Sequence, residues 1–170
     1  RDCPKTQSIP TKMLRDIQNL EWVFPVVCKP YNGRSSQGLR YIHNQQEWSE
    51  FISTADKDVY IVEPFIEGPL VMVEIVRQIE PHKVIATTRR ELISTLHGCS
   101  TTVYIYQDKE LEEASKILAD KLNVWGDVNF EYILDKNGKY HLVECNPRFS
   151  AGCEFSCMSG YDYIENHIKC

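Results

Sequence analysis

Apolar residues recur along the chain with two spacings, one typical of helices and one of strands. Thr11 to Leu20 carries apolar side chains three and four positions apart, which predicts a helix. Asp108 to Leu122 repeats that spacing most clearly, with charged residues along its opposite face. Shorter helices are predicted from Glu47 to Ile52 and from Tyr161 to Ile168.

Short apolar runs between turn residues predict strands. Helical and strand segments mix without a strict βαβ rhythm, which favours the α+β class with antiparallel hairpins. The predicted strands are Phe24–Lys29, a strand ending at Ile42, Val59–Val62, Val71–Val76, Val84–Thr88, Thr102–Tyr106, Asp127–Leu134 and Lys139–Asn146.

Composition then excludes several classes of protein. The chain has 170 residues, enough for one compact domain or two small lobes that share a cleft. No apolar run approaches the roughly 20 residues of a membrane-spanning helix, so no membrane association is expected. A formal net charge of -5 provides no broad cationic surface, so nucleic acid is not an expected partner.

Seven cysteines are scattered along the chain, several of them inside apolar runs. The sequence contains no glycosylation acceptor and no secretory signal, so we expect free thiols in a reducing cytoplasm. Cys153 and Cys157 lie four positions apart, but no second pair with zinc-ligand spacing accompanies them. The spacing alone therefore predicts no metal there.

Asn137-Gly138 predicts a tight hairpin near the end of the chain, because a type I′ turn needs positive φ at both residues. If these two residues form the whole loop, Glu131 faces Glu144, and side chains alternate between the two faces of the hairpin. The predicted apolar face consists of Phe130, Tyr132, Val143 and Cys145. The predicted polar face consists of Asn129, Glu131, Glu144 and Asn146.

Two directly opposed carboxylates repel each other unless a cation lies between them. Ligand atoms that are all oxygen select a hard ion such as Mg²⁺. Asn146-Pro147-Arg148 adds an amide oxygen and a fixed cation next to Glu144, a combination that suits a metal-bound polyphosphate. The alternative is a solvated outer face of an ordinary hairpin, where like charges cost little.

A second candidate is the polar loop that follows Lys29. Glycines at Gly33 and Gly38 allow backbone N–H groups to approach phosphate oxygens closely. The P-loop interpretation fails, because Leu39-Arg40 stands where Lys-Ser/Thr is required. Taken alone, this loop is also compatible with an ordinary strand connection.

In order and spacing, these segments resemble the ATP-grasp superfamily, particularly the ATP-binding domains of carbamoyl-phosphate synthetase large-subunit-like proteins. Each motif is weak alone, and together they cover nearly the whole chain. The matching segments are Phe24–Pro30 with the loop to Gly38, Val62–Gly68, Gly126–Glu131 and Val143–Arg148.

The resemblance implies two α+β lobes with ATP between them, a small β-rich lobe at about residues 22–65 and a larger antiparallel-sheet lobe at about 66–170. It also implies a preceding N-terminal α/β domain before Arg1. Leu70 stands near where many relatives carry an acidic ribose ligand, so sugar recognition is expected to fall to Glu67 or another group.

The resemblance also implies a role for each matching residue. Lys29 and Arg148 would be catalytic, Lys29 on the ATP phosphates and Arg148 on the transferred γ-phosphoryl group. Glu131, Glu144 and Asn146 would hold one or two Mg²⁺ ions, with Mn²⁺ as an alternative. The implied cofactor-binding residues are Lys29, Gly33, Arg34, Ser35, Ser36, Gly38, Glu63, Pro64, Phe65, Glu67, His97 and Asn129.

The implied activity is an ATP- and Mg²⁺-dependent carboxylate–amine or carboxylate–thiol ligase acting through an acyl phosphate. Its partners would be a small-molecule carboxylate and an amine or other nucleophile, and a homodimer stays open. Two alternatives remain: an ATP-grasp phosphotransferase, and a nucleotide-sensing module without catalysis.

Overall fold

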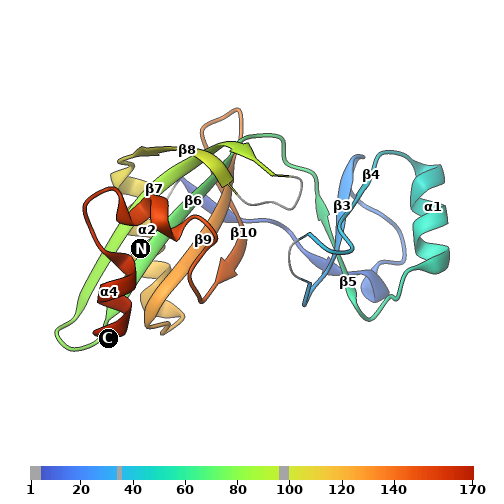
Figure 1. Ribbon diagram of the computed structural model, residues 1–170. Coiled ribbons are helices and arrows are strands. Elements are labelled where there is room, and N and C mark those ends of the chain that lie inside the picture. Colours follow the sequence, from blue (N-terminus) through green and yellow to red (C-terminus); the bar gives the residue numbers. More distant parts are fainter. Residues whose placement is uncertain (1–4, 34–35, 96–99) are drawn as a thin grey trace. The chain divides into compact units, whose positions relative to one another are not determined.

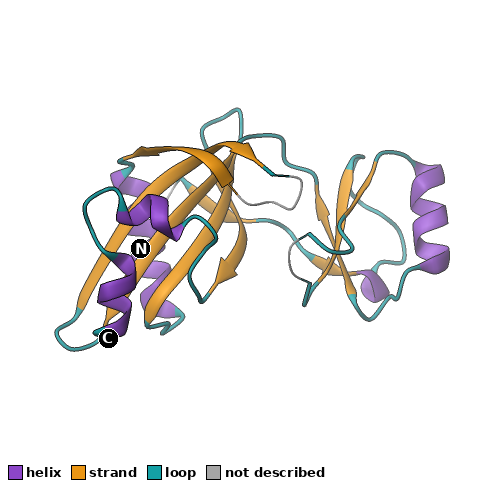
Figure 2. Cartoon of the chain, in the orientation of Figure 1, coloured by secondary structure: helices purple, strands orange, loops and turns teal. Residues whose placement is uncertain are grey.

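The strands of the protein form two separate sheets, and the chain divides into two compact units around them. The computed structural model describes residues 5–33, 36–95 and 100–170, shown in Figures 1 and 2. The smaller unit is Ile9–Ile66, and the larger one comprises Glu67–Cys170 together with the residues up to Ser8. The predicted α+β class is confirmed.

The smaller unit is built on a four-stranded antiparallel sheet in the order β2-β5-β3-β4. Its helix α1 (Gln45–Thr54) begins at Asn44, whose side-chain oxygen accepts hydrogen bonds from the N–H groups of Gln46 and Glu47. The strands are β2 (Lys12–Met13), β3 (Val26–Pro30), β4 (Arg40–Ile42) and β5 (Tyr60–Pro64). The core consists of Leu14, Val26, Cys28, Ile42, Trp48 and Val62.

The predicted helix from Thr11 to Leu20 is wrong. The segment contains strand β2, paired with β5, and one short 3-10 turn, η1 (Leu14–Asp16). Its apolar residues still enter the core, where Leu14 is buried and Ile17 and Leu20 pack against it. Pairing with the β5 edge satisfies the backbone of residues 12–13, so the helical spacing reflects burial rather than a helix.

The larger unit contains a six-stranded sheet in the order β1-β10-β9-β6-β7-β8, antiparallel except for the β1–β10 pair. Strand β7 continues well past its predicted end. The strands are β1 (Thr6–Ser8), β6 (Leu70–Gln78), β7 (Lys83–Ser94), β8 (Ser100–Tyr106), β9 (Gly126–Leu134) and β10 (Tyr140–Asn146).

Helices pack on both faces of this sheet (Figure 1). Helix α2 (Lys109–Lys121) buries Leu111 and Ala119 in the main core with the apolar residues of β6 and β9. Helices α3 (Cys153–Cys157), which the pattern did not predict, and α4 (Tyr163–Ile168) cover part of the opposite face. None of the helices in the described residues is long and apolar enough to cross a membrane.

The hairpin between β9 and β10 differs from the predicted two-residue turn. Positive φ occurs at Gly138 and not at Asn137, so the turn is not type I′. Asp135 Oδ1 accepts hydrogen bonds from the N–H groups of Asn137 (2.8 Å) and Lys139 (2.9 Å). These bonds close a three-residue loop, and a register shift between Leu142 and Glu144 follows.

That register shift changes the predicted core face. Leu142, not Val143, is the partner of Tyr132, and Leu142 packs against the main core. Val143 is the extra residue of the irregularity, as in a β-bulge. Beyond it, the predicted pair Glu144–Glu131 is present, and Cys145 pairs with Phe130 and Asn146 with Asn129.

Candidate metal and nucleotide site

Four residues predicted from the sequence meet on the β9–β10 hairpin, on the face opposite α2. Glu131 and Glu144 are direct cross-strand partners. Asn146 donates a hydrogen bond from Nδ2 to Glu131 Oε1 (3.2 Å), and Arg148 donates from Nη2 to Asn146 Oδ1 (3.1 Å). The Glu131 carboxylate, the Asn146 amide and the Arg148 guanidinium are thereby joined by hydrogen bonds, and Glu144 lies opposite Glu131 on the next strand.

The electrostatic environment of Glu131 disfavours a negative charge. Burial, with the carboxylates of Glu144 and Glu91, raises the pKa of Glu131 to about 7. Arg89 and Arg148 act in the opposite direction without compensating fully. A cation would relieve this cost. The carboxylate oxygens of Glu131 and Glu144 are ligands of the kind that Mg²⁺ prefers, as is the Asn146 amide oxygen, which here accepts a hydrogen bond from Arg148. Mn²⁺ accepts the same kinds of ligand.

In the smaller unit, Lys29 and Glu63 lie on neighbouring strands and form an ion pair. Lys29 Nζ lies 2.9 Å from Glu63 Oε2, and Thr11 Oγ1 donates a hydrogen bond of 2.9 Å to Glu63 Oε1. Glu63 is only 7% exposed, so these two partners hold a nearly buried carboxylate in place. The lysine and glutamate predicted to bind phosphate and adenine are thus coupled to each other.

The residues after Glu63 form an exposed corner of the same unit. Phe65 is 40% exposed and packs edge-on against Tyr41. Its backbone N–H donates a hydrogen bond of 3.2 Å to the Pro25 carbonyl. Pro64 is half-buried at the end of β5 and pairs with Val26. This corner is the segment predicted to recognise the base edge.

The loop after Lys29 turns tightly where it is described. Gly33 N–H donates to the Pro30 carbonyl (3.2 Å), and Ser36 and Gly38 both have positive φ. A side chain at Gly38 would lie 2.8 Å from Pro30 Cγ, so glycine is required there by backbone conformation and by space. The predicted ligands Arg34, Ser35 and His97 lie outside the described residues.

Two further predicted ligands differ in exposure, although Asn129 lies on β9 two residues before Glu131 and opposite Asn146. Asn129 is fully buried, and its Nδ2 group donates a hydrogen bond of 3.4 Å to Glu74 Oε2. Glu67 is exposed at the start of the larger unit. Their roles in nucleotide binding stay predictions.

The sequence reasoning missed a buried ion pair beside the candidate site. Arg89 of β7 and Glu74 of β6 are both fully buried, with Arg89 Nη1 2.6 Å from Glu74 Oε2. Arg89 also donates hydrogen bonds to Ser150 Oγ and Ser156 Oγ, and each of these bonds is 2.7 Å long. Ser150 in turn donates to Glu74 through its N–H group and its hydroxyl. This network ties the loop after Arg148 and helix α3 to the sheet.

A signal for this pair was present in the sequence. Glu74 interrupts the apolar run Val71–Val76, and a charge inside a buried strand requires a partner. Nothing in the local pattern identifies Arg89 rather than Arg90 as that partner. The strand register decides, because Arg89 and not Arg90 lies on the face of Glu74.

The fold is a two-sheet α+β domain, and comparison with known proteins identifies its family. The family model described as ATP-grasp domain matches residues 3–152. The chain belongs to the ATP-grasp family.

Two curated relatives are similar in sequence. The D-alanine–D-alanine ligase of Buchnera aphidicola subsp. Schizaphis graminum is 30% identical over 138 residues, which is 75% of this chain and 45% of the relative. The carbamoyl phosphate synthase large chain of Clostridium perfringens is 25% identical over 154 residues, which is 84% of this chain and 14% of the relative. The chain therefore spans less than half the length of either.

Solved structures share the fold. The biotin carboxylase domain dimer of Hydrogenobacter thermophilus 2-oxoglutarate carboxylase, in complex with MgADP, ADP and bicarbonate, matches with a TM-score of 0.75. The match covers 95% of this chain and 41% of that chain, at 19% identity. At this identity the likeness concerns the fold alone.

Proposed function

We propose that the chain is the nucleotide-binding part of an ATP- and Mg²⁺-dependent ligase. The ligase would join a small-molecule carboxylate to an amine or a thiol through an acyl phosphate. The observation that carries the proposal is the opposition of Glu131 and Glu144, with Asn146 hydrogen-bonded to Glu131 and Arg148 hydrogen-bonded to Asn146. Membership of the ATP-grasp family and similarity to two ATP-grasp ligases support it.

The proposed metal site is the group Glu131, Glu144 and Asn146. When bound there, Mg²⁺ would neutralise phosphate oxygens and act as a Lewis acid. Glu131 and Glu144 would supply carboxylate oxygens, and Asn146 an amide oxygen. Mn²⁺ is proposed as a substitute, since it accepts the same oxygen donors.

The remaining residues would act through charge and position. Arg148 would stabilise the negative charge on the transferred phosphoryl group, because its guanidinium is fixed beside Asn146. Lys29 would bind phosphate oxygens, and Glu63 with Pro64 and Phe65 would recognise the adenine edge. The backbone N–H groups of the loop from Gly33 to Gly38 would contact phosphate and limit the access of water.

We further propose a cytoplasmic location. The five cysteines in the described part of the chain, namely Cys28, Cys145, Cys153, Cys157 and Cys170, are all free thiols. Free thiols in this number are typical of a reducing compartment.

Trapping with hydroxylamine tests the proposed chemistry. The complete protein that carries this chain is incubated with ATP, Mg²⁺, hydroxylamine and pools of carboxylates, and ADP and hydroxamate are measured. The proposal predicts Mg²⁺-dependent release of both, because hydroxylamine attacks an acyl phosphate. ADP without hydroxamate would favour a phosphotransferase, and nucleotide binding without ADP release would favour a sensing module.

A further inference from the structure

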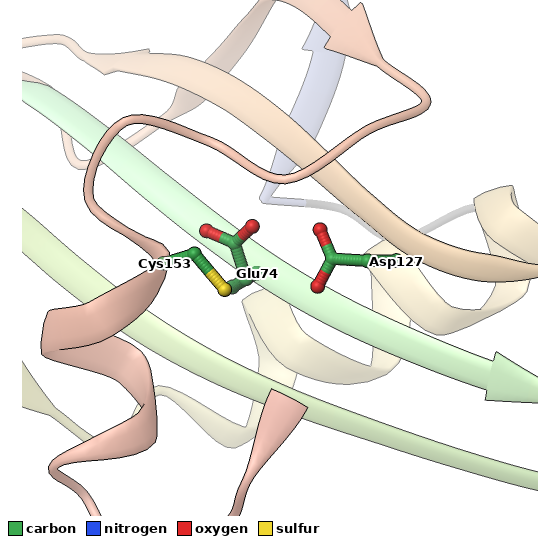
Figure 3. A group of neighbouring side chains, drawn as sticks. All are labelled: Glu74, Asp127 and Cys153. Carbon is green, nitrogen blue, oxygen red and sulfur yellow. The ribbon is translucent and has the colours of Figure 1, made fainter. Parts of the chain in front are cut away.

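A second group of ligand-type side chains is buried in the larger unit, further along the sheet face that carries Glu131. The group consists of Glu74 of β6, Asp127 of β9 and Cys153 of α3. One carboxylate oxygen of Glu74, one of Asp127 and the sulfur of Cys153 all lie within 4.8 Å of one another. Figure 3 shows the two carboxylates and the thiol turned toward one another from these three elements. The residues are 0%, 2% and 4% exposed, respectively.

Several buried polar atoms in and next to this group lack a hydrogen-bond partner among the described residues. Both carboxylate oxygens of Asp127 are buried and have no hydrogen-bond partner among the described residues. The same holds for Oδ1 of Asn129, two residues further along β9 and on the same face. Buried carboxylate and amide oxygens are nearly always satisfied in folded proteins, so three such orphans in adjacent positions require an explanation.

We propose that Glu74, Asp127 and Cys153 bind one divalent cation of the Zn²⁺ type. Zn²⁺ accepts thiolate and carboxylate ligands together in a tetrahedral arrangement. Mg²⁺ and Ca²⁺ take oxygen ligands, so the thiolate separates this site from the oxygen-only group at Glu131 and Glu144. The fourth position falls to a water molecule or to the unpartnered amide oxygen of Asn129.

The local charges balance when such a cation is bound. Glu74, Asp127 and the Cys153 thiolate carry three negative charges, and Arg89, which contacts Glu74, together with the cation carries three positive charges. Without the cation, burial and the Glu74 carboxylate raise the pKa of Asp127 to about 9, and burial raises the pKa of the Cys153 thiol. Binding therefore exchanges two protons, one from Asp127 and one from Cys153, for one cation.

The three ligands come from β6, β9 and α3, which are not consecutive elements of the chain. A cation would fasten the start of α3 to strands β6 and β9, next to the loop that follows Arg148. Spacing along the chain could not indicate the site, because Glu74, Asp127 and Cys153 are far apart in the sequence.

Metal analysis with matched variants tests the proposal. The chain is folded with Zn²⁺ present, since all three ligands are buried, and excess metal is then removed by gel filtration. We expect about one bound equivalent in the parent chain and in Cys157→Ser, which changes the thiol one helical turn further along α3. Cys153→Ser and Asp127→Asn should each lose the bound metal.

Substitution with Co²⁺ identifies the ligand. A thiolate-to-cobalt charge-transfer absorption in the near ultraviolet is expected in the parent chain and in Cys157→Ser, and not in Cys153→Ser. The Asp127→Asn variant keeps the shape of the side chain, so circular dichroism should show that it folds without metal. Glu144→Gln, in the other candidate site, should keep the cobalt signal.

Two results would overturn the proposal. One is a folded parent chain that retains no metal after gel filtration. The other is a cobalt spectrum that Cys153→Ser leaves unchanged, which would assign the metal to a different thiol.

Discussion

Glu131 lies directly opposite Glu144 across β9 and β10, one residue beyond the irregularity at Val143. Two carboxylates in this relation have Cβ atoms about 5 Å apart and repel each other in the absence of a cation. Asn146 donates a hydrogen bond to Glu131 and supplies no positive charge to the pair. We therefore expect the pair to bind a cation.

Replacing Glu144 should separate binding from folding. Glu144 is exposed, so Glu144→Ala should change the free energy of unfolding by less than about 0.5 kcal/mol. Mg²⁺-dependent ATP binding, measured by calorimetry, should weaken at least tenfold, which corresponds to about 1.4 kcal/mol or more. Glu113→Ala on the exposed face of α2 is the matched control. Unchanged affinity in Glu144→Ala would remove this residue from the metal site.

The pairing of Glu131 with Glu144 could be predicted from the sequence, although the turn from which it was predicted is not the one that forms. The two-residue turn predicted the pair Glu131–Glu144 directly. The observed three-residue loop alone would shift the register by one and put the two carboxylates on opposite faces. The irregularity at Val143 restores the predicted pairing. Loop length and bulge compensate each other, and neither is visible in the alternation of apolar and polar residues.

Helix α2 and most strands could be predicted because the spacing of their apolar residues matches the side of the element that is buried. Thr11 to Leu20 shows where this fails, since its residues reach the core from a strand and a 3-10 turn. The Glu74–Arg89 pair shows a second limit. A pairing between strands depends on register, and register is set by turns and tertiary contacts rather than by local composition.

Loss of Arg89 should destabilise the larger unit strongly. Arg89→Met leaves the fully buried Glu74 carboxylate without its cation, which typically costs about 3–5 kcal/mol. Urea unfolding followed by circular dichroism measures this change. The neighbouring Arg90 is exposed, so Arg90→Met should cost less than about 0.5 kcal/mol. Equal losses in the two variants would contradict the role assigned to the buried pair.

Lys29 should matter for nucleotide binding more than a surface lysine of the same unit. Lys29→Met removes the cation beside Glu63 and the proposed phosphate contact, and we expect ATP affinity to fall at least tenfold, or about 1.4 kcal/mol. Lys12 forms an exposed ion pair with Glu21, so Lys12→Met should leave affinity nearly unchanged. Calorimetric titration of both variants decides, and equal affinities would argue against a phosphate contact by Lys29.

The turn of the β9–β10 hairpin should make stability depend on pH in the acid range. The hydrogen bond from His141, followed by those from the N–H groups of Lys139 and Asn137, lowers the pKa of Asp135 to about 2. Because the folded pKa lies below the ordinary value of 3.8, the stabilisation is complete above that value and is lost as the pH falls through about 2. Asp135→Asn should therefore unfold at a lower temperature than the parent chain near neutral pH, and the difference should shrink in acid. His141→Gln removes the largest cause and should weaken this pH dependence, whereas a difference that stays constant across the acid range would show that the Asp135 charge does not stabilise the turn.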